Sequence, residues 1–168
     1  MSSVSLLYAY VGPKRILDAL RPDDAGVCIH DVRTLIAWLQ LQEISDSGFV
    51  TATFVIDENG DLWLAPRRSE HVKCASGRPV QSAGEITFTT TGKVAEISNQ
   101  STGYCPEPHS WNACAKALNR IPVMHPGKFT MPIEFRRCPQ CGERNIVKDG
   151  WFFCDVCEAE LPDKWNFR

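Results

Sequence analysis

Hydrophobic and polar positions follow a helical spacing along the first forty residues. In PKRILDALRP, residues 13–22, the apolar side chains fall on one side of a short helix bounded by two prolines. A second helix is predicted from its cap, Asp31, through Leu39, because apolar residues recur there at i, i+3, i+4 and i+7. The chain is therefore predicted to begin with two amphipathic helices.

The middle of the chain changes to the residue types of β-strands. Residues 49–65, FVTATFVIDENGDLWLA, contain two β-branched and aromatic runs joined through Asn59 and Gly60. An Asn-Gly step readily takes the positive φ angles of a tight hairpin turn. A second hairpin is predicted over residues 85–98, with its turn near Gly92. Together these hairpins predict an antiparallel sheet of at least four strands.

A third helix is predicted after the polar loop that follows this sheet. Ser110 is its predicted cap, the apolar residues from Trp111 to Leu118 keep the helical period, and Pro122 ends it. Residues 122–132 carry three prolines and one glycine, a composition typical of a connection.

Two CxxC pairs dominate the last part of the chain. Their ligands are predicted to be Cys138, Cys141, Cys154 and Cys157, with twelve residues between the pairs. Four thiolates in tetrahedral geometry select zinc and leave no open position for water or substrate, so we expect one structural Zn²⁺. A hairpin of residues 145–147 and 151–153, turning at Asp149-Gly150, is predicted to bring the pairs together.

These elements predict an α+β fold, in which a small antiparallel sheet packs with two or three helices and a C-terminal zinc-ribbon β-hairpin follows. Residues 1–132 form the predicted α+β domain with a central block of polar loops, and residues 133–168 form the predicted four-cysteine zinc ribbon. Such a ribbon is too small to fold without its metal.

Composition and charge limit the classes of partner. Of 168 residues, 43% are apolar and 23% charged, with a net charge of −2, so no basic excess attracts nucleic acid or an anionic membrane. Residues 5–12, SLLYAYVG, lack the charged lead and cleavage site of a secretion signal. Paired CxxC thiols suit a reducing compartment. We therefore expect a cytoplasmic protein without a membrane partner.

The central block runs from RRSEHVKCASGRPVQSAGEITF through ISNQSTGYCPEP and gathers small and polar residues between strands. Loops of this kind form either tight turns or a binding site. The block resembles one found in uncharacterised bacterial proteins, in toxin-like C-termini and in plant proteins with calmodulin-binding IQ motifs. Over residues 50–168 the chain is most similar to the uncharacterised bacterial proteins that add a C-terminal zinc ribbon.

The resemblance implies no established activity, but it singles out particular positions. These are His71, Gly77, Pro79, Gly84, Asn99, Ser101, Tyr104 and Pro106. Where related blocks read Ser-Gly-His-Tyr, residues 101–104 read Ser-Thr-Gly-Tyr, so a histidine is missing beside the tyrosine. A mechanism with two histidines is therefore not expected.

Two chemical hypotheses remain open for the block. In the first, His71 and Glu85 form an acid/base pair, and Ser101 and Tyr104 position an unknown polar substrate of a nucleotide-like type. In the second, His71, Cys74, Cys105 and His109 form another zinc site, although their spacing is not standard for one.

Three functions follow from these features. The leading hypothesis is a cytosolic zinc-binding protein that acts as an interaction or accessory module for a protein partner, since no nucleophile elbow or phosphate loop is present. The alternatives are an enzyme of the central block and nucleic-acid binding by the ribbon. The ribbon's cations for that role are Arg136, Arg137, Arg144 and Lys148. The formal charge of −2 on a four-thiolate zinc site disfavours nucleic acid.

The aromatic residues of the ribbon are expected to pack on the first domain or on another protein. They are Trp151, Phe153, Trp165 and Phe167.

Overall fold

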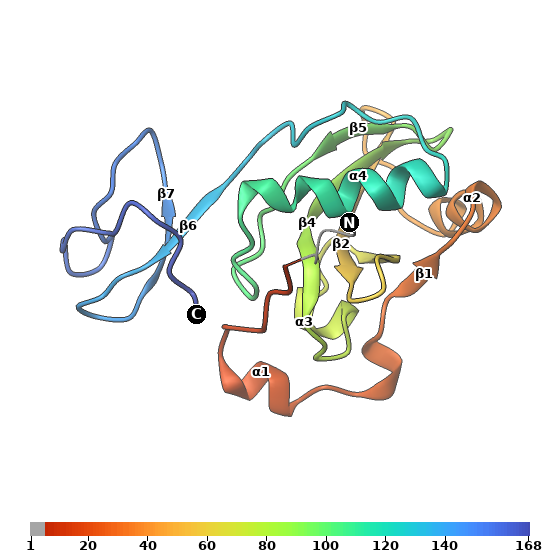
Figure 1. The fold of residues 1–168 in the computed structure, drawn as a ribbon. Helices are drawn as coiled ribbons and strands as arrows, with labels where there is room; N and C mark the ends of the chain where they lie inside the picture. Colours follow the sequence, from red (N-terminus) through yellow and green to blue (C-terminus); the bar gives the residue numbers. More distant parts are fainter. Residues whose placement is uncertain (1–5) are drawn as a thin grey trace, which may run out of the picture.

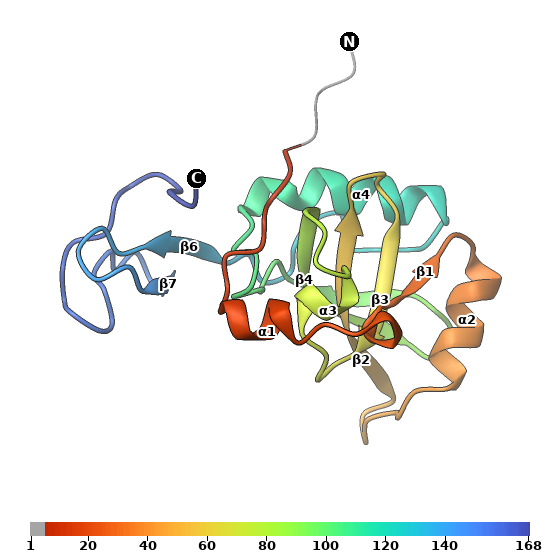
Figure 2. The same ribbon diagram turned by 90° about the horizontal axis from the view of Figure 1, so that it is seen from below.

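The computed structural model, which describes residues 6–168, confirms the predicted α+β class. A five-stranded, fully antiparallel sheet has the order β1-β3-β2-β4-β5. Its strands are β1 (Val27–Ile29), β2 (Phe49–Asp57), β3 (Leu62–Pro66), β4 (Val80–Thr89) and β5 (Val94–Ile97). The two predicted hairpins form its centre and one edge, and β1, which was not predicted, forms the other edge (Figures 1 and 2).

A buried carboxylate fixes the turn of the first hairpin. The Asp57 side chain accepts hydrogen bonds from the backbone N–H of Asn59 and of Asp61, both at 2.9 Å, and from the Trp63 indole at 2.8 Å. Gly60 has a φ of +86°, which a residue without a Cβ takes at little cost. The pairing of Phe54 with Leu64 then sets which side chains reach each core.

Over residues 6–168, six helical segments lie around the sheet. They are α1 (Lys14–Asp18), η1 (Pro22–Asp24), α2 (Val32–Gln40), α3 (His71–Cys74), η2 (Pro108–Ser110) and α4 (Trp111–Arg120), where η denotes a 3-10 helix. The first helix is shorter than predicted, and the turn α3 was not predicted. Asp31 caps α2 as expected, since its carboxylate accepts from the Thr34 N–H at 2.7 Å.

The prediction that Ser110 caps α4 is wrong. Ser110 has helical φ and ψ angles of −61° and −10°, because η2 runs directly into α4. An N-cap side chain needs an extended backbone to reach the following N–H groups. The Ser110 hydroxyl instead lies 2.9 Å from the Ser82 Oγ and joins α4 to β4.

Each face of the sheet carries its own core. Alternate strand side chains such as Phe54, Leu64 and Ile86 pack against α2 and α4. The opposite face, which includes Val55 and Ala83, packs against α3 and the N-terminal segment. Figures 1 and 2 show α4 and α2 separated from α1 and α3 by the strands. Because both faces of the sheet are buried, the loops of the central block are held between the sheet and the segments that cover it.

The C-terminal unit contains β6 (Glu134–Arg137) and β7 (Arg144–Val147), and Figure 1 shows it at the end of the molecule remote from α2. The predicted turn is present, since Asp149 and Gly150 have φ of +53° and +70°. The predicted pairing is wrong: residues 145–147 pair with β6, and Trp151 makes only a single bridge to Lys148. Each CxxC loop instead joins its own flanking residues, Arg137 with Arg144 and Phe153 with Glu160.

Within the described part of the chain, residues 6–168, no helix has the length and apolar character needed to cross a membrane.

Candidate metal centre

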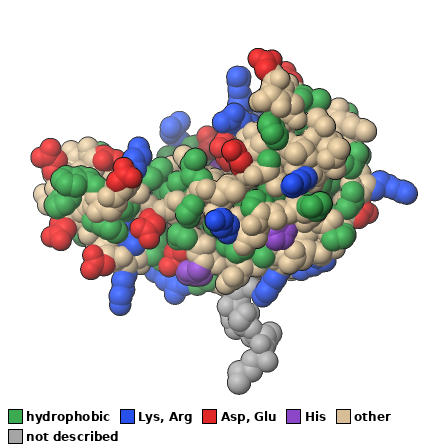
Figure 3. Space-filling model, turned by 90° about the horizontal axis from the view of Figure 1, so that it is seen from above, with side chains coloured by type: hydrophobic (Ala, Val, Ile, Leu, Met, Phe, Trp, Pro, Cys, Tyr) green, Lys and Arg blue, Asp and Glu red, His purple; other side chains and the backbone are tan. Residues whose placement is uncertain are grey.

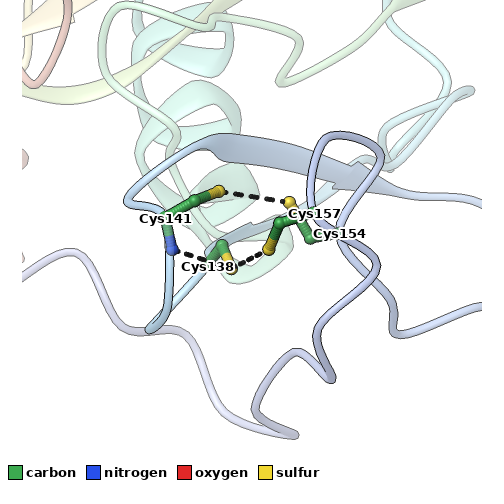
Figure 4. Close-up of side chains that lie close together, drawn as sticks. All are labelled: Cys138, Cys141, Cys154 and Cys157. Carbon is green, nitrogen blue, oxygen red and sulfur yellow. Dashed lines mark hydrogen bonds between the residues drawn. The ribbon is translucent and has the colours of Figure 1, made fainter.

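The four ribbon cysteines point their sulfur atoms at one another (Figure 4). All four Sγ atoms lie within 4.8 Å of each other, with 3.5 Å between Cys138 and Cys157 and 3.6 Å between Cys141 and Cys154. These separations are far longer than a disulfide bond of about 2.05 Å. They are close to the edge of about 3.8 Å that a tetrahedron with Zn–S bonds of about 2.3 Å requires. The residues therefore fit a single tetrahedral metal ion.

Backbone and side-chain donors surround the sulfur atoms. The N–H of Cys141 lies 3.4 Å from the Cys138 Sγ, and the N–H of Val156 lies 3.4 Å from the Cys154 Sγ. Backbone N–H groups, with that of Cys157 contributing most, lower the pKa of the Cys154 thiol to about 6. A thiolate is the form that binds metal, so the backbone N–H groups favour the ligand state of Cys154 and, in the same direction, of Cys138. The pKa values of Cys141 and Cys157 are raised instead: backbone N–H groups act to lower them, but burial and neighbouring thiols outweigh this effect.

Asn145 is a buried residue that links the two CxxC loops. Its Nδ2 donates to the Cys154 Sγ at 3.5 Å and to the Glu143 carbonyl at 3.1 Å, while its Oδ1 accepts from the Asp155 N–H at 2.9 Å. The side chain is 3% exposed. An amide in this place orients one ligand and holds both loops in register.

The ribbon arginines are engaged inside the chain. Arg136 is buried and donates to the carbonyls of Phe135, Pro162 and Asp163. Arg137 donates to the Gly142 carbonyl at 3.2 Å, and Arg144 donates to the Thr102 carbonyl. These contacts leave the guanidinium groups poorly placed to bind a phosphate backbone.

Residues of the central block, which lies in the first predicted domain, contact the ribbon. Asn99 is fully buried, and its Nδ2 donates to the carbonyls of Pro106 and Ile133 while its Oδ1 accepts from the Ile133 N–H at 2.7 Å. Trp165 packs edge-on against Tyr8, with ring centroids 5.5 Å apart. Asn99, one of the positions that the resemblance singles out, therefore helps to join the two predicted units.

The two predicted acid/base residues lie on the same face of the sheet but have different partners. His71 opens α3, and its Nε2 donates to the Gly84 carbonyl at 2.9 Å. Burial lowers the pKa of this imidazole, so it is neutral at pH 7. Glu85 lies 3.3 Å from Arg67, on the wall of an open groove of about 900 Å³ that His71 does not line.

The residues that are predicted to position a substrate contact other parts of the folded chain or are buried within it. The Tyr104 hydroxyl donates to the Arg78 carbonyl at 2.7 Å, and burial raises the pKa of this phenol above its usual value. Ser101 is 1% exposed, and its Oγ has no hydrogen-bond partner. The residues of the predicted catalytic set thus have different surroundings, and their catalytic role stays a prediction.

The predicted second zinc site is not assembled. His71, Cys74, Cys105 and His109 each have a different neighbour: Gly84, Trp63, Thr102 and Glu107. Burial raises the pKa of the Cys74 and Cys105 thiols to about 12, which keeps them protonated. Across residues 6–168, the four ribbon cysteines form the one cluster of three or more such ligands.

Sequence reasoning did not identify Asn99 and Asn145 as buried organisers of this region. In the sequence, only the resemblance singles out Asn99, and Asn145 fits the pattern of a strand. No period or spacing marks an amide that will be buried, because its partners are backbone groups that tertiary folding brings to it. No protein family, curated protein or solved structure matches this chain. The resemblance of the central block therefore stays a prediction.

Proposed function

We propose that this protein is a zinc-stabilised accessory module, in which one structural Zn²⁺ folds the ribbon for contact with a protein partner. The observation that carries the proposal is the tetrahedral spacing of the four Sγ atoms. Four protein ligands leave the ion no open position, so the metal supplies folding free energy rather than Lewis-acid chemistry.

The contacts of the central block favour this role over the enzyme alternative. The His71 Nε2, the Tyr104 hydroxyl and the Asn99 amide each donate to a backbone carbonyl. A catalytic group needs a free atom aimed at a substrate position. The nucleic-acid alternative is likewise not favoured, because three of its four cations donate to carbonyls within the chain.

Metal analysis of the full chain tests the proposal. We expect one zinc per chain and a Co²⁺-substituted form whose spectrum shows tetrahedral sulfur ligation and does not respond to added imidazole. Cys154→Ser removes a buried ligand and is expected to abolish tight binding, whereas Cys28→Ser, at a half-buried cysteine of β1, keeps it.

Two results would contradict the proposal. One is a metal that binds imidazole as a further ligand, since this shows an open coordination position. The other is saturable turnover of a nucleotide or peptide that is lost in His71→Gln while zinc content stays at one per chain. Either result would move the function from an accessory module to an enzyme.

A further inference from the structure

The four ribbon aromatics divide into an inward and an outward pair. Trp165 contacts Tyr8, and Phe167 lies beside Trp165 with ring centroids 5.6 Å apart. Trp151 and Phe153 contact each other, with centroids 4.7 Å apart, yet they are 65% and 40% exposed. The outward pair thus forms a small apolar surface that intramolecular packing does not use.

Charge around this outward pair is strongly one-sided. Residues 148–160 contain one lysine and four acidic residues, all exposed: Lys148, Asp149, Asp155, Glu158 and Glu160. Within residues 6–168, none of these carboxylates takes part in a salt bridge. Figure 3 shows acidic side chains around the hydrophobic ones on the ribbon end of the molecule.

The distribution of the cations makes this asymmetry stronger. Arg136, Arg137 and Arg144 donate to carbonyls of the chain, which leaves Lys148, Lys164 and Arg168 as the exposed cations of residues 133–168. A bound Zn²⁺ with four thiolates adds a formal charge of −2 to the same unit. Around Trp151 and Phe153 the exposed charge is therefore mainly acidic, with Lys148 as the one cation of residues 148–160.

We infer that Trp151 and Phe153 form the docking surface for a basic segment of a partner protein, rich in lysine or arginine with apolar side chains between. An ammonium or guanidinium group binds over an aromatic face, and the surrounding carboxylates attract further cations. This inference rests on the proposed function, because the metal holds the docking surface in place. A second copy of this chain is a poorer occupant, since its own ribbon carries the same acidic surface.

The test uses the zinc-loaded full chain and a short synthetic peptide of alternating lysine and leucine. A peptide of alternating glutamate and leucine is the matched control. We expect the basic peptide alone to bind, and binding to weaken as salt rises. Trp151→Ala is expected to weaken binding about tenfold or more, as loss of a central aromatic anchor does. Leu41→Ala, at an apolar residue of α2's end that is 83% exposed, should leave binding unchanged.

A second variant tests the carboxylates separately. The double change Asp155→Asn and Glu158→Gln is expected to slow association and reduce its salt dependence, whereas Glu96→Gln on β5 is the matched control. Zinc content and melting temperature are measured for each variant, and both should match the parent.

The outcomes separate this inference from the proposed function. If zinc is bound and the fold is intact but Trp151→Ala binds the basic peptide as well as the parent does, the docking inference is wrong and the zinc module stands. If Trp151→Ala instead converts a dimer into a monomer, the occupant is a second copy and the inference is again overturned. If no zinc binds, both proposals fail.

Discussion

The indole Nε1 of Trp165 donates a hydrogen bond to the Cys105 carbonyl at 2.7 Å, across 60 residues of sequence. This contact joins the last segment of the ribbon to the loop of the central block. Cys105 has a φ of +44°, so its carbonyl belongs to a loop in an unusual conformation that Trp165 helps to hold. The ribbon and the sheet domain are therefore coupled through a tryptophan near the chain's end.

Trp165→Phe is expected to lower the free energy of unfolding by about 1 kcal/mol, because the Cys105 carbonyl loses its donor while most of the packing remains. Urea unfolding of the zinc-loaded protein measures this loss. Trp151→Phe is the matched control and should have no effect, since Trp151 is exposed and donates to no residue across the unit boundary. Equal stability of the two variants would show that the contact does not couple the units.

Asn145→Ala is expected to lower zinc affinity about ten- to a hundredfold, as loss of a group that orients a metal ligand commonly does. The change removes the donor to the Cys154 Sγ and the acceptor of the Asp155 N–H. Competition with a chromogenic chelator measures the affinity. Asn112→Ala, on the exposed side of α4, should leave it unchanged. An affinity within twofold of the parent would contradict the role given to this amide.

Gly84→Ala is expected to destabilise the protein by about 3 kcal/mol or more, or to prevent folding, because overpacking against backbone is not easily relieved. A Cβ at residue 84 would lie 1.9 Å from the Ser98 carbonyl oxygen. Gly127→Ala is the comparison: its φ is +80° and its surroundings are open, so only the conformational cost of about 1 to 2 kcal/mol applies. Thermal unfolding of both variants distinguishes steric overlap from backbone strain, and equal losses would refute the overlap.

The stability of the protein is expected to fall as the pH drops below the usual histidine pKa of 6.5, in part through His71. Burial lowers the pKa of His71 in the folded state, so the unfolded chain binds a proton first as the solution becomes more acidic. His71's contribution is thus fully present above pH 6.5 and declines between that pH and its lower folded pKa. His71→Gln, which retains a donor for the Gly84 carbonyl, should flatten this part of the profile.

Urea unfolding of zinc-loaded protein across this pH range measures the effect. His109→Gln, at an exposed histidine, is the comparison for the substitution itself. Metal loss at low pH affects all three proteins alike, so the comparison isolates the imidazole. A profile of His71→Gln identical to that of the parent would contradict the buried, neutral state of His71.

The sequence by itself determined the elements whose signals are local. The Asn59-Gly60 turn, the apolar period before Leu39 and the paired CxxC loops depend on residues close together in the chain, so both hairpins, α2 and the cysteine cluster could be predicted. The strand β1, with three residues, carried too weak a pattern to predict.

Only the tertiary structure decided how the polar residues are used. Ser110 looks like a cap in sequence, yet it faces Ser82, and Asn145 looks like a strand residue, yet it donates to a metal ligand. His71 and Glu85 suggest an acid/base pair, but the fold gives them the Gly84 carbonyl and Arg67 as partners. A buried polar group takes whichever donor or acceptor the folded chain brings to it, and that choice depends on long-range packing that no local spacing encodes.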